Sequence, residues 1–157
     1  MDFMIAPASA DDAEIVAELT QELLEEIMVA TGSGQFSVDR AALATLGRDF
    51  LVCGLYTVYL AHQGGQAAGF IALSETRALY AGGSFGIITE LYVRPALRSS
   101  GLGARLLAAA REHGKVRGWT RLEVTTPPLP EFDRTLHFYE TSGFGITGGR
   151  KLKTTLG

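Results

Sequence analysis

The sequence predicts a single domain, residues 1–157, of mixed α/β (α+β) class, and three patterns carry this prediction. Segments with helical spacing of apolar residues alternate with short apolar runs that are typical of strands. Gly64 and Gly65 stand between two such runs, which indicates an antiparallel hairpin. Farther on, a strand, a helix and a second strand over 86–125 are expected to form a right-handed crossover with parallel strands.

The expected elements follow one another without an internal repeat. Ser9 followed by DDAE is typical of a capped helix start, and Gly118 and Gly143 are expected to end the third and fourth helices. The helices are expected over 11–30, 38–50, 101–117 and 133–141. The strands are expected over 3–6, 55–62, 66–79, 86–93 and 119–126, with one or two more over 144–156.

The composition is that of an ordinary globular protein. Hydrophobic residues make up 46% of the chain and charged residues 20%, and the formal net charge is −3. This charge argues against a dedicated nucleic-acid binder, whose surface is expected to be basic. The apolar runs are too short to span a membrane and the N-terminus lacks a leader pattern, so we expect a cytoplasmic protein without membrane contact. Cys53 stands among apolar residues and is expected to be a buried, unreactive thiol.

A glycine-rich stretch, RSSGLGA at 98–104, lies between the strand at 86–93 and the next helix. The first N–H groups of a helix have no partner inside the helix and lie at the positive end of its dipole. Glycine lets a ligand approach the backbone, and Arg98 can add a charged donor to the same anion. The pattern Arg-x-x-Gly-x-Gly therefore predicts an anion site, with phosphate as the first candidate.

Two familiar phosphate loops do not fit these residues. A P-loop has a lysine and a hydroxyl residue after its last glycine, whereas Gly103 is followed by Ala104 and Arg105. A dinucleotide fingerprint begins directly after the strand and has a third glycine where this chain has Leu106. A nucleoside triphosphate and a dinucleotide are therefore disfavoured as ligands.

Three motifs together resemble the GNAT superfamily of N-acetyltransferases, which bind acetyl-coenzyme A. RSSGLGA matches the pyrophosphate-binding motif of that family, and LYV at 91–93 matches the strand that lines the pantetheine arm. HFYETSGF at 137–144 matches the C-terminal motif with its tyrosine. The order of elements fits as well, so the resemblance covers nearly the whole chain. It implies the GNAT-type acyl-CoA N-acyltransferase fold, a central mixed sheet of six to seven strands flanked by about four helices.

The resemblance implies where acetyl-coenzyme A would bind. The backbone of Leu91, Tyr92 and Val93 would pair with the pantetheine amides like an added strand. The acetyl group would lie where this strand and RLEV at 121–124 separate, with a backbone N–H facing the thioester oxygen. The side chain of Arg98 would assist backbone N–H groups in holding the pyrophosphate. These N–H groups belong to Ser99, Ser100, Gly101, Leu102, Gly103 and Ala104.

Three residues are candidates for the chemistry of direct acetyl transfer to a primary amine. The amine must lose a proton to attack, and Glu90 or Glu123 is the candidate base. Glu90 could instead be solvated or paired with Arg77 or Arg121, and Glu123 could merely brace its strand. The motif assigns Tyr139 to protonating the departing thiolate, and packing of its ring is the alternative. The His and Cys residues have no spacing typical of a metal site, so no metal is expected.

The acceptor is expected to be a small primary amine or an amino-acid derivative. The family resemblance implies that it would bind between the loop over 28–37 and the C-terminal strands. Glu22, Glu25 and Glu26 could attract a cationic amine, or they could form a solvated helix face. An aromatic component is suggested by Phe36, Tyr80 and Phe85. Many family members have an asparagine seven residues before the motif tyrosine, where this chain has Phe132.

Other functions remain open from the sequence. A protein N-terminus or lysine side chain is an alternative acceptor, and a nucleotide-binding regulator is a weaker reading. A non-catalytic acyl-coenzyme A sensor would need the loop but neither Tyr139 nor a carboxylate. Dimers are common in the family, and a C-terminal strand over 146–156 could pair with a second copy to give a homodimer.

Overall fold

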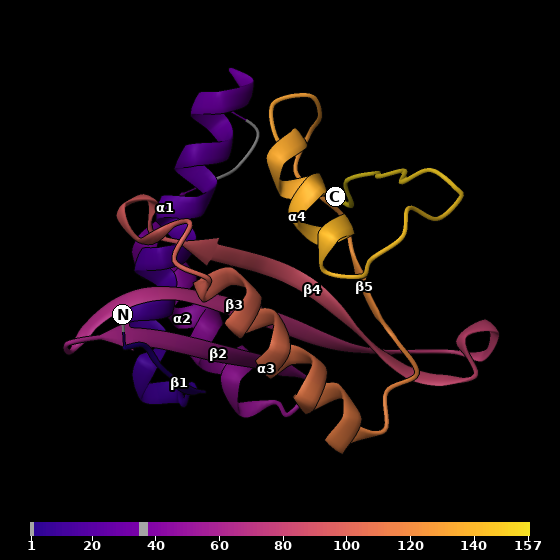
Figure 1. Ribbon diagram of the computed structural model, residues 1–157, viewed down its shortest axis with the longest axis horizontal. Helices are drawn as coiled ribbons and strands as arrows, with labels where there is room; N and C mark the ends of the chain where they lie inside the picture. The colour runs from indigo at the N-terminus through magenta and orange to yellow at the C-terminus, as the bar shows by residue number, and fades with distance from the viewer. Residues whose placement is uncertain (1, 35–37) are drawn as a thin grey trace. The chain divides into compact units, whose positions relative to one another are not determined.

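A computed structural model describes residues 2–34 and 38–157, in which the elements follow the predicted order (Figure 1). The chain divides into two units, residues 1–125 and 126–157. Within the described ranges, the first unit holds a five-stranded sheet and three α-helices, and the second holds one α-helix.

The helices begin and end within two residues of their predicted bounds. They span Ala13–Thr31 (α1), Arg40–Val52 (α2), Leu102–Arg117 (α3) and Asp133–Thr141 (α4). The strands span Met4–Pro7 (β1), Tyr56–Gln63 (β2), Gln66–Ala78 (β3), Gly83–Val93 (β4) and Leu122–Val124 (β5). The predicted cap of the first helix is present, because Ser9 N–H donates to Asp12 Oδ2 at 2.8 Å and Asp11 N–H donates to Ser9 Oγ at 3.3 Å.

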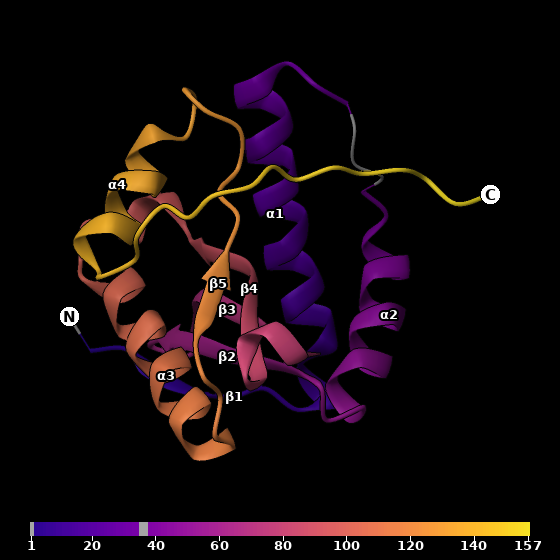
Figure 2. The same ribbon diagram turned by 90° about the vertical axis from the view of Figure 1, so that its right-hand side faces the viewer.

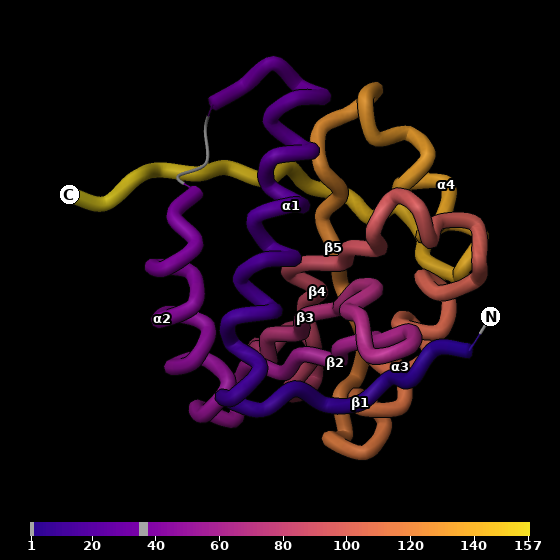
Figure 3. Tube along the Cα trace, turned by 90° about the vertical axis from the view of Figure 1, so that its left-hand side faces the viewer, coloured from indigo at the N-terminus to yellow at the C-terminus, as the bar shows by residue number. Residues whose placement is uncertain are grey.

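The sheet of the first unit has the strand order β1-β2-β3-β4-β5. The first four strands are antiparallel in sequence, and β5 runs parallel to β4, as the crossover prediction required. Gly64 and Gly65 form the predicted turn between β2 and β3. Helices α1 and α2 lie on one face of this sheet and α3 lies on the other (Figures 2 and 3).

Apolar side chains fill the space between the sheet and the helices on both faces. Toward α1, one cluster joins Val16 and Leu19 of the helix to the strands through Val58 and Phe70. Side chains alternate between the two faces along a strand, so Ile71 and Leu73 of β3 face α3. The side chains that α3 buries are Leu102, Leu106, Leu107 and Ala110.

The expectation of six to seven strands is wrong, because residues 142–157 form neither a helix nor a strand. Ile146, Leu152 and Leu156 are exposed, so the residues after Phe144 bury no apolar face that would offset the entropy of ordering an extended backbone. Five glycines in residues 142–157 raise that cost further. The edge strand on which the homodimer expectation depended is therefore missing. The strand predicted over 119–126 is also shorter, since β5 covers only Leu122–Val124.

The expectation for Cys53 is also wrong, because its side chain is exposed. It lies at the C-terminal cap of α2, beside the exposed Val52, and not on a helix face that meets the sheet.

Trp119 anchors the first half of β4 to the end of α3. Its ring lies so close to β4 that a Cβ atom added at Gly86 would overlap ring carbons Cζ3 and Cε3. The indole Nε1 donates to Glu75 Oε1 at 2.7 Å, and Arg117 Nε donates to the same oxygen at 2.9 Å. The Glu75 side chain is only 5% exposed, and these partners, Trp119 foremost, lower its pKa. A buried carboxylate with such donors stabilises the fold in its charged form.

We expect Gly86→Ala to lower the free energy of unfolding by about 1–3 kcal/mol, because the new methyl group must displace the Trp119 ring. Gly47→Ala is the matched control, since Gly47 lies inside α2 with open space at its Cβ position. That change should instead raise the free energy of unfolding by about 0.5–1 kcal/mol through helix propensity. Urea unfolding measures both, and equal effects of the two changes would contradict the close packing at Gly86.

Glu75→Gln should destabilise the protein in a pH-dependent way. The folded pKa of Glu75 is lowered, so its stabilising effect is present above the ordinary carboxyl range and is lost as the pH falls through the folded pKa. We expect a loss of about 2 kcal/mol at neutral pH, typical of hydrogen bonds to a charged group. The gap to the unchanged protein should narrow below about pH 4. Urea unfolding over this pH range tests it, with Glu25→Gln as an exposed control, and a gap independent of pH would contradict it.

Candidate functional site

The second half of β4 forms an open edge of the sheet. β4 and β5 pair only from Gly86 opposite Leu122 to Ile88 opposite Val124, and β5 ends there. Beyond this point β4 continues to Val93 while paired with β3 alone. The two parallel strands thus separate after Ile88, at the position where the family resemblance places the acetyl group.

Alternation along β4 decides which backbone groups face this open edge. Arg94 N–H donates to Ala68 C=O of β3 at 2.9 Å, so the backbone of Arg94 points toward β3. Because successive residues of a strand point their N–H and C=O groups to opposite sides, the backbone groups of Tyr92 also point toward β3. The backbone groups of Leu91 and Val93 point away from β3. Of the three residues predicted to bind the pantetheine arm through their backbone, these two therefore face the open edge.

A β-bulge precedes this segment. Ala72 of β3 pairs with Glu90, whereas the next residue, Leu73, pairs with Ile88, so Thr89 is an extra residue in β4. If Thr89 were paired regularly with Ala72, Glu90 would lie opposite Ile71, on the apolar face covered by α3. With it, Glu90 shares the face of Ala72, toward α1. Because of the bulge, the Glu90 carboxylate is not buried among aliphatic side chains, which would be costly.

Glu90 is half-buried and accepts two hydrogen bonds from hydroxyl groups. Tyr56 Oη donates to Glu90 Oε1 at 2.6 Å, and Thr89 Oγ1 donates to the same oxygen at 2.7 Å. Burial and the charge of Glu90 together raise the pKa of Tyr56, so this phenol stays protonated at neutral pH. Arg77 and Arg121, the alternative partners, pair with other carboxylates, Glu75 and Glu123.

Glu123 lies on the same face of the sheet as Glu90, because it pairs with Ile87 in the parallel register. Its side chain is 43% exposed and accepts from Arg121 Nε at 2.9 Å. The Arg121 guanidinium also lies 5.3 Å from the ring centres of both Tyr80 and Phe85. Glu123 therefore belongs to a cluster of charge and aromatic rings, in which Tyr80 is 78% exposed.

The predicted phosphate loop leads from β4 into α3. Ser99 and Gly101 both have positive φ, +64° and +85°, and the backbone turns sharply before the helix. Ser100 Oγ donates to Leu97 C=O at 2.5 Å, which holds the turn closed. The first hydrogen bond into the helix runs from Arg105 N–H to Gly101 C=O at 3.1 Å. The N–H groups of Leu102, Gly103 and Ala104 therefore precede the helical hydrogen bonds, as expected for an anion site.

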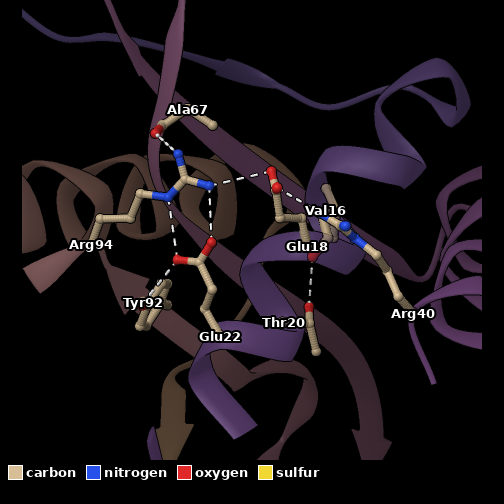
Figure 4. A network of polar contacts seen from close by, with 8 residues as sticks. All are labelled: Val16, Glu18, Thr20, Glu22, Arg40, Ala67, Tyr92 and Arg94. Carbon is tan, nitrogen blue, oxygen red and sulfur yellow. Dashed lines mark hydrogen bonds and ion pairs between the residues drawn. The ribbon is translucent and has the colours of Figure 1, made fainter. Parts of the chain in front are cut away.

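An ion-pair network fixes the point where this loop begins (Figure 4). Arg94, the residue after β4, donates to both oxygens of Glu22 at 3.2 and 3.0 Å, to Glu18 at 3.2 Å and to Ala67 C=O at 2.9 Å. Tyr92 Oη donates to Glu22 Oε1 at 3.1 Å. Glu18 also pairs with Arg40 at the start of α2. The end of β4 is thus tied to α1 and, through it, to α2.

Arg98 is held in the same manner one helical turn along α1. Its guanidinium donates to both oxygens of Glu26, at 3.0 and 2.6 Å, and its Nε donates to Val93 C=O at 2.9 Å. Glu22 and Glu26, considered from the sequence as attractors of a cationic acceptor, are therefore engaged with arginines. One sequence signal could have indicated these ion pairs. Glu18, Glu22 and Glu26 are spaced four residues apart, and Arg94 and Arg98 have the same spacing.

Tyr139 lies in α4, within the second unit, and its side chain is buried. Its ring packs edge-on against Phe138 and Phe144, each at 5.3 Å between ring centres. Burial raises the pKa of this phenol, so it is protonated at neutral pH. His137, two residues earlier, is exposed.

Phe36, named as an aromatic candidate for the acceptor site, lies outside the described residues. Within residues 2–34 and 38–157, no group of three or more His, Cys, Asp or Glu side chains could hold a metal ion. No helix in these ranges is long and apolar enough to cross a membrane.

One comparison with known proteins shows the family of this chain. The model of the acetyltransferase (GNAT) domain matches residues 54–146, more than half of the chain. No curated protein matches the sequence. Among solved structures, an aminoglycoside N-acetyltransferase, AAC(6')-Iy, in complex with CoA aligns with a TM-score of 0.81 and 19% identity, covering 98% of this chain and 95% of that one.

Two further structures have the same architecture. A ribosomal-protein-alanine N-acetyltransferase from Brucella melitensis biovar Abortus 2308 aligns with a TM-score of 0.75 and 18% identity, covering 98% of this chain and 100% of that one. A predicted acetyltransferase from Clostridium acetobutylicum with acetyl-CoA aligns with a TM-score of 0.79 and 17% identity, covering 98% of this chain and 96% of that one. At these identities the likeness establishes the α+β fold that the sequence predicted.

Arg94→Gln should lower the free energy of unfolding by about 2 kcal/mol, because it leaves the partly buried Glu22 without its charged donor and removes one of the two arginines that pair with Glu18. Arg40→Gln removes an ion pair of the same Glu18 in which the arginine is 49% exposed, and should cost less than about 1 kcal/mol. Urea unfolding of the two variants tests the network. Equal losses of unfolding free energy in the two variants would mean that Arg94 contributes no more to the network than the exposed Arg40 does.

Proposed function

Because the chain belongs to the acetyltransferase (GNAT) domain family, we propose that it transfers the acetyl group of acetyl-coenzyme A directly to the primary amine of a small molecule or an amino-acid derivative. One observation carries this proposal: the open edge of β4 beside Glu90 leads directly into the phosphate loop. A thioester held along this edge would have its acetyl end near the carboxylate and its phosphates at the start of α3.

Two groups of backbone atoms are proposed to bind acetyl-coenzyme A. Leu91 and Val93 would pair with the pantetheine amides through the open edge, as a peptide strand does when it adds to a sheet. The N–H groups of residues 99–104 would hold the pyrophosphate at the positive end of α3. Arg98 would assist only by giving up part of its contact with Glu26, so we assign it the secondary role.

In the proposed reaction the amine nitrogen attacks the thioester carbonyl carbon. A carbon–nitrogen bond forms, the carbon–sulfur bond breaks, and a backbone N–H at the open edge of β4 stabilises the charged oxygen between these steps. Glu90 takes the proton that the amine loses, directly or through water. Tyr139, protonated at neutral pH, gives its proton to the departing thiolate. Glu123 is the second candidate base, weaker because Arg121 occupies its carboxylate.

The acceptor proposal favours a small cationic amine. AAC(6')-Iy is an aminoglycoside N-acetyltransferase with the same fold, which supports an amine-rich small molecule. The exposed ring of Tyr80, near Phe85 and Arg121, supports an acceptor that makes stacking contacts. A protein N-terminus is the alternative acceptor, supported by the ribosomal-protein-alanine N-acetyltransferase.

We propose that residues 1–157 form one transferase domain, because each of the three solved structures aligns with 98% of the chain. A cytoplasmic location stays a prediction.

The proposal predicts selective binding of acetyl-coenzyme A with a micromolar or lower dissociation constant. Isothermal titration calorimetry of the purified protein measures it, with ATP and NADPH as control ligands. A panel of aminoglycosides, polyamines, amino-acid amides and a peptide with N-terminal alanine is then screened by thiol release. No binding of acetyl-coenzyme A would contradict the whole proposal, and binding without turnover of any amine would favour a sensor.

With the best amine, Glu90→Gln and Tyr139→Phe should each lower kcat by about 10²-fold, the smaller end of what positioned acids and bases contribute. Tyr59→Phe is the control, because its hydroxyl contacts His113 of α3 on the opposite face of the sheet. Glu123→Gln distinguishes the two carboxylates. If Glu123→Gln lost activity while Glu90→Gln kept it, Glu123 would be the base.

A further inference from the structure

The carboxylate of Glu90 has a different environment at each of its two oxygens. Both hydroxyl donors, Tyr56 Oη at 2.6 Å and Thr89 Oγ1 at 2.7 Å, contact Oε1. A carboxylate oxygen has two lone-pair sites, so two donors fill the sites of Oε1. Oε2 carries neither of these bonds, and it is the oxygen left to accept a proton.

Tyr56 reaches Glu90 across an intervening strand. Side chains in the same row of a sheet share a face, and here Tyr56, Ser74 and Ile87 form one row while Val58, Ala72 and Glu90 form the next. The residues of β3 in these rows, Ser74 and Ala72, are small. The phenol can therefore pass over β3 and meet a carboxylate two strands away.

Other contacts hold the Tyr56 ring in this place. Phe50 of α2 packs against it at 5.2 Å between ring centres, and the ring borders the core cluster beneath α1. Burial and the charge of Glu90 raise the pKa of Tyr56, so its hydroxyl stays protonated and can donate at neutral pH. Thr89 is held by the bulge itself, because it is the extra residue of β4.

We propose that Tyr56 is a positioning residue for Glu90: together with Thr89 it holds Oε1 and turns Oε2 toward the acceptor amine as the proton-accepting atom. The inference rests on the proposed role of Glu90 as the base. Tyr56 lies at the start of β2, far from the motifs that the family resemblance uses. It brings β2 to the face of the sheet that carries Glu90 and Glu123, and its contact with Phe50 connects the proposed base to α2.

Tyr56→Phe tests the inference with the best amine of the panel as acceptor. It should lower kcat on the order of tenfold or more, because a misplaced reacting group is costly even when displaced by about 1 Å. The dissociation constant for acetyl-coenzyme A, measured by calorimetry, and the melting temperature should move no more than in Tyr59→Phe. That control also removes one hydroxyl hydrogen bond from β2, on the opposite face.

Thr89 provides an independent pair of variants. Thr89→Val removes the second donor and should lower kcat in the same direction, whereas Thr89→Ser keeps the hydroxyl and should restore it. Loss of activity in both variants would mean that the bulge, and not the hydrogen bond, is what Thr89 provides, and it would overturn the role assigned to the two donors.

The double variant Tyr56→Phe with Glu90→Gln separates this inference from the proposed function. If Tyr56 acts through Glu90, the double variant should have the kcat of Glu90→Gln alone. A further tenfold loss in the double variant would overturn the inference, as would a Tyr56→Phe variant as active as Tyr59→Phe; in both cases an impaired Glu90→Gln would leave Glu90 as the base. Full activity of Glu90→Gln would overturn the base assignment and the inference together.

Discussion

Thr89 is the extra residue in β4, and the bulge that takes it up places every later side chain of the strand on the face opposite to the one that unbroken alternation would give. Ile88, before the bulge, packs on the face covered by α3, whereas Glu90 and Tyr92 lie on the face covered by α1. The same shift sets which backbone groups of Leu91 and Val93 reach the open edge. A charged side chain, a core aromatic ring and the open edge of the sheet are thus oriented by one residue.

Two anchors at opposite ends hold β4 in this register. At its start, Trp119 fits against Gly86 and donates to the buried carboxylate of Glu75. At its end, Arg94 is held by Glu18 and Glu22 of α1. Because both ends are fixed, the separation of β4 from β5 occurs at a defined place in the middle. The predicted phosphate loop also starts from a fixed point, because Arg94 at its beginning is paired with glutamates of α1.

Local signals explain why the sequence predicted so much of the fold. Capping residues at Ser9, the glycine pair at 64 and 65 and the glycines after α3 and α4 act over a few residues, so their effect can be read without tertiary structure. The predicted strand over 144–156 failed because a strand also needs a partner and a face to bury, and neither is encoded locally. The ion pairs of Glu22 and Glu26 could not be predicted for a similar reason, since their arginine partners lie about seventy residues away.

The sequence by itself determined the order of helices and strands, the glycine-rich turn before α3 and the family, because these depend on local propensity and on short motifs. Only the tertiary structure decided that Thr89 is a bulge, that β5 leaves β4 after Ile88, and that Tyr56 meets Glu90 across β3. These features arise from pairing between distant segments. Register and side-chain contacts across strands are settled by the packing of both faces of the sheet at once, which no stretch of residues specifies alone.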